Sequence, residues 1–117
     1  LICRTVRPIF EEILYNLCDN GIKYNKDNGT VTIHLKDIGN AIQISVEDNG
    51  IGIPREDRNR VFERFYRVDK SHSKEIGGTG LGLSIVKHGV AFLGGTLELT
   101  SEVDSGTEIT VTLPKQA

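Results

Sequence analysis

The sequence predicts an α+β two-layer sandwich, in which a layer of helices covers one face of a single sheet. Apolar residues recur at helical spacing from Pro8 to about Tyr24 and from Gly80 to about Leu93. Two pairs of alternating segments are each joined by a short turn, as in β-hairpins. With a short charged helix predicted near Glu56–Phe62, the order is helix, hairpin, helix, helix, hairpin. This order fits helices packed on one sheet.

The first helical stretch has an apolar face and a polar face. Pro8 suits the opening turn of a helix, because the N–H that proline lacks would have no helical partner there. The polar face carries Asn16, Asn20 and Lys23 at spacing i, i+4, i+7. Two amide oxygens one turn apart can coordinate a hard cation such as Mg²⁺, and the lysine adds a charge for phosphate. A face that is simply solvated is the alternative interpretation.

Alternation of apolar and polar residues predicts four strands. The first hairpin is Val31–Leu35 with Ile42–Val46, and the second is Thr96–Ser101 with Thr107–Leu113. Two glycines, Gly94 and Gly95, end the helix that precedes the second hairpin.

The segment 48–52, Asp-Asn-Gly-Ile-Gly, directly follows the second strand. A carboxylate such as that of Asp48 can accept a hydrogen bond from an exocyclic amine, for example adenine N6. The glycines let the backbone approach a flat ring closely. The alternative is an Asn-Gly reverse turn that pairs Val46 with Ile51 and Ile53.

The segment 62–67 holds two arginines and three aromatic residues. Either Arg64 or Arg67 could reach a terminal phosphate, which a guanidinium group binds through two hydrogen bonds. We expect Phe62 and Phe65 to anchor this segment in the core.

Residues 77–83, Gly-Gly-Thr-Gly-Leu-Gly-Leu, lead from a polar loop into a helix. Consecutive glycines let backbone N–H groups point the same way, and a helix N-terminus favours phosphate. The segment is not a P-loop, because Leu83 rather than lysine follows Gly82. It is not a dinucleotide-binding loop, because no hydrophobic strand precedes it. A flexible linker before an ordinary helix remains the alternative.

Length and composition limit the possible classes. The 117 residues form one domain, 1–117, and the absence of methionine suggests a piece of a longer protein. No apolar run is long enough to cross a membrane, and no signal-peptide pattern opens the chain. A formal net charge of −2 argues against a general nucleic-acid binder. Cys3 and Cys18 form neither a metal-binding nor a disulfide pattern.

In this order, four motifs at residues 16–24, 48–54, 62–67 and 78–83 resemble the catalytic and ATP-binding domain of sensor histidine kinases, and Gly106-Thr107 resembles that family's last glycine turn. The resemblance covers nearly the whole chain. It implies the Bergerat ATP-binding fold of the GHKL ATPases, with a mixed, mostly antiparallel sheet covered on one face by about three helices. It also implies transfer of the ATP γ-phosphoryl group to a histidine.

The resemblance also assigns roles to residues. Asn16 and Asn20 would hold Mg²⁺ and the phosphates, and Lys23 would contact phosphate. Asp48 would accept a hydrogen bond from adenine N6, and Arg67 would reach the terminal phosphate. The other predicted nucleotide contacts are Tyr24, Gly50, Gly52, Ile53, Gly78, Thr79, Gly80, Leu81, Gly82, Leu83 and Thr107, and residues 69–78 would form the ATP lid.

One departure from related ATPases concerns hydrolysis. Gyrase-type, mismatch-repair and chaperone relatives carry a water-activating glutamate where this chain has Asn16, and an amide cannot accept a proton at neutral pH. The resemblance therefore favours phosphoryl transfer over intrinsic ATP hydrolysis. Gly21 stands where alanine is common and Asn25 where serine or threonine is frequent, and neither touches the expected chemistry.

The acceptor is expected on a separate helical hairpin of the same parent protein, with a response regulator as the indirect partner. In the family, an acidic residue follows the acceptor histidine, and none of His34, His72 and His88 fits. We expect a cytoplasmic domain, whether or not the parent spans a membrane. An anti-sigma-type serine kinase or a non-catalytic regulatory lobe of the same fold is the alternative, although the intact glycine stretch and both asparagines disfavour a degenerate lobe.

Overall fold

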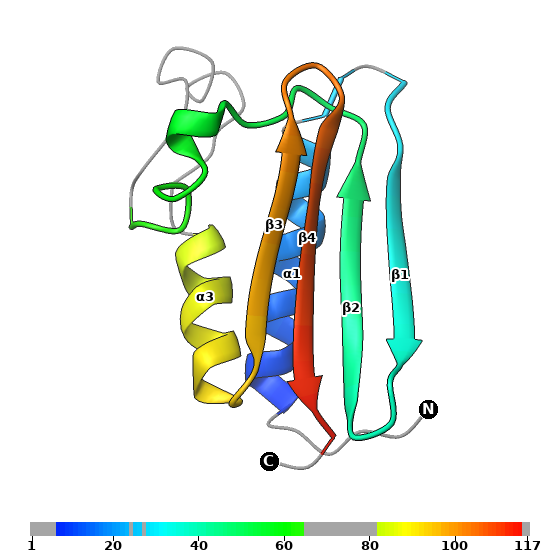
Figure 1. The fold of residues 1–117 in the computed structure, drawn as a ribbon, viewed down its shortest axis with the longest axis vertical. Coiled ribbons are helices and arrows are strands. Elements are labelled where there is room, and N and C mark those ends of the chain that lie inside the picture. Colours follow the sequence, from blue (N-terminus) through cyan, green and yellow to red (C-terminus); the bar gives the residue numbers. More distant parts are fainter. Residues whose placement is uncertain (1–6, 24, 27, 65–81, 116–117) are drawn as a thin grey trace.

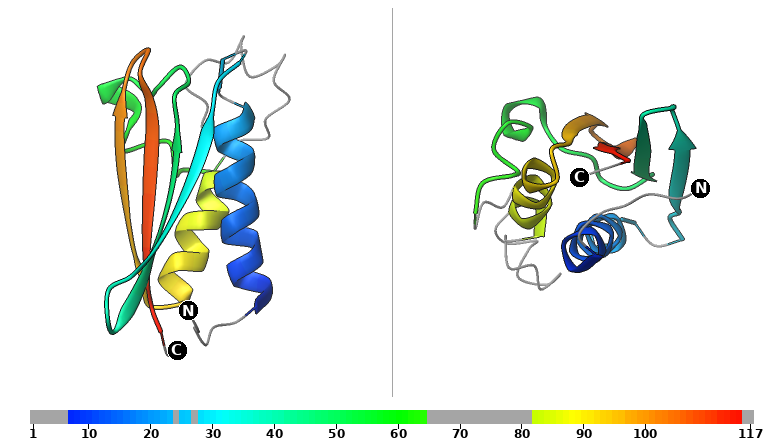
Figure 2. Two further views of the ribbon diagram at one scale, coloured as in Figure 1. Left: turned by 90° about the vertical axis from the view of Figure 1, so that its right-hand side faces the viewer. Right: turned by 90° about the horizontal axis from the view of Figure 1, so that it is seen from below.

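The computed structural model describes residues 7–23, 25–26, 28–64 and 82–115. Two helices and a four-stranded sheet form two layers, and both helices lie on the same face of the sheet (Figures 1 and 2). In chain order the elements are α1 (Arg7–Lys23), β1 (Val31–Asp37), β2 (Ala41–Asp48), the 3₁₀ helix η1 (Arg55–Asp57), α3 (Gly82–Phe92), β3 (Thr96–Glu102) and β4 (Gly106–Pro114).

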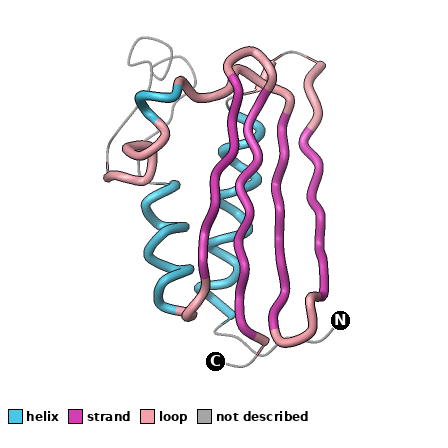
Figure 3. Tube along the Cα trace, in the orientation of Figure 1, coloured by secondary structure: helices cyan, strands magenta, loops and turns pink. Residues whose placement is uncertain are grey.

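The strand order is β1-β2-β4-β3, and every neighbouring pair is antiparallel (Figure 3). Both predicted hairpins are therefore confirmed, and β4 joins them by pairing with β2. The described part of the sheet has no parallel pair, whereas a mixed sheet was expected. Val46 pairs with Ile33 and Ile109, so the alternative that pairs Val46 with Ile51 and Ile53 is wrong.

The hydrophobic core lies between the helices and strands β2 and β4. Its fully buried side chains include Ile13 and Leu17 of α1, and Val86 of α3. The two helices pack closely, because a Cβ atom on Gly89 would lie 3.1 Å from Ile13 Cγ1. The buried strand residues are Ile42, Ile44, Val46, Ile109, Val111 and Leu113. The apolar stripes read from the sequence thus form one core, as predicted.

The predicted helix near Glu56–Phe62 is wrong. The chain forms the three-residue 3₁₀ helix η1 there, followed by single turns such as the bond from Val61 N–H to Asp57 O at 3.1 Å. Val61 is buried, but residues 56–60 carry no apolar side chain. Without an apolar stripe, tertiary packing does not hold a longer helix. Among the described residues two α-helices cover the sheet, which is consistent with the predicted helical layer on one face.

Candidate functional site

The hydrophobic core ends, at one end of the sheet, in a row of three buried polar residues. Asp48, Thr107 and Ser101 lie side by side on β2, β4 and β3, because Asp48 pairs with Thr107 and Thr107 pairs with Ser101. They are 8%, 7% and 4% exposed. Each continues the core-facing positions of its strand, since alternate residues share a face. We call these three residues the polar row. The preceding row is apolar and consists of Val46, Ile109 and Leu99.

The Asp48 carboxylate is held by backbone donors. Its Oδ1 accepts a hydrogen bond from Gly50 N–H at 2.9 Å. Burial raises the pKa of Asp48 above its ordinary value, while hydrogen bonds from the backbone N–H groups of Gly50 and Thr107 partly oppose this rise. The charge of Glu47 raises the pKa slightly further. The result is a partly desolvated carboxylate whose position is fixed by the backbone.

Two glycines allow the chain to close around the polar row. Gly52 has φ +75° and Gly106 has φ +118°. A Cβ atom on Gly52 would overlap the carbonyl oxygen of Glu102, and one on Gly106 would overlap that of Asp48. The loop after β2 therefore lies directly against the turn between β3 and β4, and Asp104 N–H donates to Ile51 O at 2.9 Å. Only glycine fits both positions.

The polar face of α1 meets the start of α3. Asn16, Asn20 and Lys23 are all half-buried. The side-chain amide of Asn16 donates to Glu12 O at 2.8 Å. The Asn16 Oδ1 atom lies 3.2 Å from the position that a Cβ on Gly82 would take. The structure therefore brings together two predicted residues that are far apart in the sequence, with the amide oxygen directed toward the first turn of α3.

Lys23 ends this face of α1 and pairs with Asp19, with 3.0 Å between Nζ and Oδ2. The last turn of α1 lies over the sheet next to the polar row. A Cβ on Gly21 would lie 3.4 Å from Val31 Cγ1 and 3.7 Å from Val46 Cγ1. Val46 is the core-facing residue just before Asp48. The C-terminal half of α1 and the polar row thus occupy the same end of the molecule, at the top of Figure 1.

The remaining predicted contacts divide into two groups. Gly50 and Ile53 are buried beside the polar row, and Leu83 packs partly buried against the core. The predicted contacts that lie outside the described residues are Tyr24, Arg67, Gly78, Thr79, Gly80 and Leu81, together with the proposed lid at 69–78.

Sequence reasoning missed Ser101. It was assigned only to a strand, yet its Oγ accepts a hydrogen bond from Ile53 N–H at 2.8 Å. It also lies 2.9 Å from both Gly106 O and Thr107 Oγ1. The strand alternation contains the indication, because Ser101 follows Leu97 and Leu99 at the positions that face the core.

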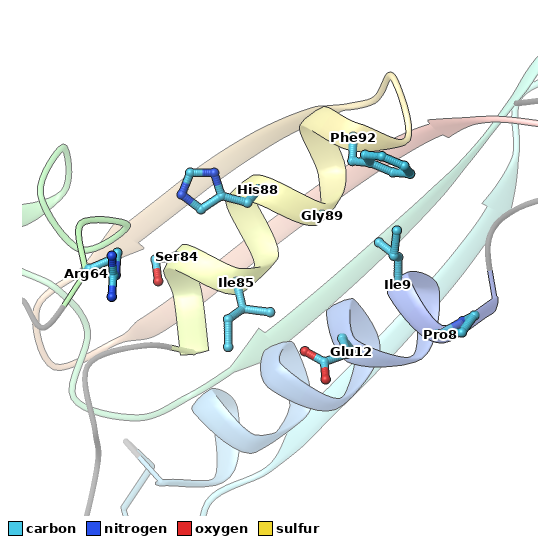
Figure 4. A pocket seen from close by; sticks show the side chains of 9 residues that line it. All are labelled: Pro8, Ile9, Glu12, Arg64, Ser84, Ile85, His88, Gly89 and Phe92. Atoms are coloured by element: carbon cyan, nitrogen blue, oxygen red, sulfur yellow. The ribbon is translucent and has the colours of Figure 1, made fainter.

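A groove of about 760 Å³ lies apart from these residues, between α1 and α3 (Figure 4). Arg64, the alternative to Arg67 for a terminal phosphate, lines it, whereas none of the described residues to which the resemblance assigns a nucleotide contact does. Its lining residues are Pro8, Ile9, Glu12, Arg64, Ser84, Ile85, His88, Gly89 and Phe92. In the described part of the chain, no three His, Cys, Asp or Glu side chains gather as a metal cluster.

None of the helices described here combines the length and apolar character needed to cross a bilayer.

The chain matches a known family and several characterised proteins. The family described as "Histidine kinase-, DNA gyrase B-, and HSP90-like ATPase" matches residues 5–117. The sensor-like histidine kinase SenX3 of Mycolicibacterium smegmatis is 46% identical over 100 residues, which cover 86% of this chain and 26% of SenX3. The chain therefore spans about a quarter of the length of this relative.

Solved structures show the same fold. The mycobacterial sensor histidine kinase MprB matches with a TM-score of 0.83 and 30% identity, covering 97% of this chain and 77% of that one. Full-length ShkA in complex with AMPPNP matches with a TM-score of 0.76 and 32% identity, covering 91% of this chain and 21% of ShkA. The two-layer arrangement predicted from the sequence is thus confirmed.

Proposed function

The chain belongs to the histidine kinase-, DNA gyrase B- and HSP90-like ATPase family, and on this premise we propose that it binds Mg-ATP and supplies the γ-phosphoryl group to a histidine on a separate phosphoacceptor domain. Its relatives identify it as a catalytic domain of the protein-histidine kinase type. Because it spans about a quarter of SenX3, the acceptor would lie in another part of the same parent protein.

The observation that carries this proposal is the buried carboxylate of Asp48 at the end of the core. The backbone N–H groups of Gly50 and Thr107 donate to it, and an ionised carboxylate, with about four lone-pair sites, can still accept from a ligand that donates a hydrogen bond. An exocyclic amine on a flat apolar ring is such a donor, and the ring can continue the core. Gly52 and Gly106 remove the side chains that would otherwise crowd this end. Adenine has this combination of properties.

The phosphate side would lie between α1 and α3. The Asn16 amide nitrogen is committed to Glu12 O, which leaves its oxygen as the group directed toward Gly82. Asparagine oxygens suit Mg²⁺, and this ion, when bound, would neutralise phosphate charge. Lys23 pairs with Asp19 through its ammonium group. This group carries three donors, so it could also donate a hydrogen bond to phosphate. Arg67 and the loop amides of residues 78–81 stay predictions for the same step.

Asn16 also bears on the fate of the bound nucleotide. An amide cannot remove a proton from water, so this residue does not promote hydrolysis. Phosphoryl transfer depends mainly on positioning and charge neutralisation. We therefore expect the chain to hold ATP until an acceptor side chain is presented to it.

The first test is a calorimetric titration with Mg-ATP. Asp48→Asn should weaken binding roughly 10- to 100-fold, because it removes the negative charge and replaces one acceptor oxygen with an amide nitrogen that can only donate. Glu47→Gln is the matched control, since Glu47 is the exposed neighbour on the opposite face of β2, and it should bind like the unmodified chain. Equal affinities for the unmodified chain and Asp48→Asn would show that adenine does not contact Asp48.

The second test concerns the acceptor. The chain is mixed with a separately made phosphoacceptor hairpin and ATP labelled on the γ-phosphate. Label on the hairpin that is lost in acid and retained in base supports transfer to histidine. Label that resists acid favours the alternative serine kinase. No label on the hairpin, despite ATP binding, favours the non-catalytic regulatory lobe.

A further inference from the structure

We propose that Ser101 is a positioning residue that fixes the hydroxyl of Thr107 as a hydrogen-bond acceptor and thereby selects a 6-amino purine over a 6-oxo purine. This inference rests on the proposed nucleotide function and adds to it a residue that never needs to touch the ligand. It follows from the hydrogen-bond balance of the polar row.

The Ser101 hydroxyl is buried among three partners. It accepts from Ile53 N–H at 2.8 Å, and it lies 2.9 Å from Gly106 O and 2.9 Å from Thr107 Oγ1. These partners belong to the loop after β2 and to the first two residues of β4. One side chain of β3 thus connects the loop after β2 with the start of β4, the strand that pairs with Asp48.

The direction of each hydrogen bond follows from counting protons. A serine hydroxyl has one proton to donate and two lone pairs that can accept. Gly106 O can only accept, so the Ser101 proton goes to it. The second lone pair of Ser101 then accepts from the Thr107 hydroxyl, whose proton is occupied in this bond. The Thr107 Oγ1 atom can therefore only accept a hydrogen bond from a ligand.

The Asp48 carboxylate, next to Thr107, is also a hydrogen-bond acceptor. An ionised carboxylate has no proton to donate, and Asp48 is the in-register neighbour of Thr107. The two side chains therefore offer acceptors to whatever lies at this end of the core. A 6-amino group donates to these acceptors, whereas a 6-oxo group places a third acceptor against them. An acceptor that meets no donor in a buried site weakens binding.

The experiment compares Mg-ATP with Mg-ITP, which differ in the purine at positions 1 and 6. The unmodified chain should bind Mg-ATP more tightly. Ser101→Ala releases the Thr107 hydroxyl to rotate and donate, so the ratio of the two affinities should fall roughly tenfold. Ser101→Thr keeps a hydroxyl at this position and should keep the original ratio.

A matched control is available in the same sheet. Ser45 Oγ and Thr110 Oγ1 lie 3.0 Å apart on β2 and β4, on the face of the sheet opposite the helices. Ser45→Ala also removes one hydroxyl pair, and it should leave the ratio unchanged. A purely structural role for Ser101 would lower the melting temperature of Ser101→Ala without altering the ratio.

A double variant separates orientation from other effects. Once Thr107→Val removes the hydroxyl, Ser101→Ala should produce no further change in the ratio. A folded Ser101→Ala that keeps the original ratio overturns the inference. If Ser101→Ala does not fold, Thr107→Val decides: a reduced ratio supports the inference and an unchanged ratio overturns it. If the unmodified chain binds neither nucleotide, the proposed function fails and this inference fails with it.

Discussion

The two ends of the sheet close the same strands in different ways. At the β1–β2 turn, Asp37 Oδ1 accepts from Gly39 N–H at 2.9 Å and pairs with Lys115 Nζ at 2.8 Å, all near solvent. At the other end, Gly52 and Gly106 bring separate segments into contact around buried side chains. The first end is closed by exposed contacts, namely a local turn bond and an ion pair with Lys115, the residue that follows β4. The second depends on tertiary contacts, so its backbone geometry is fixed by residues distant in the sequence.

The two ends should differ most in the stability that is lost when a glycine is replaced by alanine. Gly106→Ala should destabilise the fold by about 3 kcal/mol or more, because the Cβ would overlap Asp48 O at an unfavourable φ. Gly39→Ala is the matched control, since Gly39 has φ +99° but no atom within 4 Å of the added Cβ. We expect it to cost about 1–2 kcal/mol. Urea unfolding of both variants measures the difference, and equal costs would contradict the comparison.

The next effect is the response of the polar row to pH. The folded-state pKa of Asp48 is raised by burial, so its contribution to stability is fully present below the unfolded-state pKa. That contribution is lost as pH rises through the folded-state pKa. Asp48→Asn cannot titrate, so its stability relative to the unmodified chain should improve with rising pH. Each unit of pKa shift corresponds to about 1.4 kcal/mol.

This prediction is checked by urea unfolding of both proteins in a series of buffers from acidic to neutral pH. The comparison between variants removes the contribution of every other titrating group. A stability difference that is constant with pH would show that the Asp48 carboxylate is not desolvated in the folded chain.

A smaller effect, of opposite sign, is expected at Gly21. This glycine also lies near the polar row, but an added Cβ would be at ordinary contact distance, 3.4 Å from Val31 Cγ1. Gly21→Ala should stabilise the chain by about 0.5–1 kcal/mol, because alanine favours the helix. Thermal unfolding measures the gain, and a loss of stability would show that α1 packs on β1 more tightly than this distance indicates.

The smallest effect is expected at the β1–β2 turn. Hydrogen bonds from Lys115 and from Gly39 N–H, aided by the charge of Lys115, lower the pKa of Asp37. Its stabilising contribution is therefore present above its unfolded-state pKa and is lost as pH falls through the lowered value. Because the pair is exposed, Asp37→Asn should change the melting temperature only slightly, and added salt should reduce this change further. A large change would mean that the exposed contacts at this end contribute as much to stability as the buried ones at the other.

The sequence predicted those features that depend on local periodicity. The helix expected from Pro8 to about Tyr24 is Arg7–Lys23, and all four strands appear within two residues of their expected ends. The position of Asp48 at a strand end was visible for the same reason. The failed helix near Glu56–Phe62 shows the limit, because charged residues alone do not give a helix a surface to pack against.

Features that depend on contacts between segments far apart in the chain could not be predicted from the sequence. Pairing of β2 with β4 joins Asp48 to Thr107, and pairing of β4 with β3 adds Ser101, which together create the polar row. The approach of Asn16 to Gly82 likewise appears only in three dimensions. Asn25 was noted only as a departure from the family, yet its side-chain amide donates to Thr30 O at 2.9 Å and closes the turn before β1. The nucleotide, phosphate and metal roles assigned to all of these site residues, within and outside the described ranges, stay predictions.

The polar row also means that nucleotide binding would stabilise the folded domain. Because hydrophobic packing stops there, a seated ring would act as one more internal side chain, supplied from outside the polypeptide. A ligand that binds the native form alone raises the unfolding free energy by about 2.7 kcal/mol at a concentration of 100 Kd. Melting temperature would thus report nucleotide supply, and a cell depleted of ATP would hold a larger unfolded fraction of this domain, exposed to its proteases.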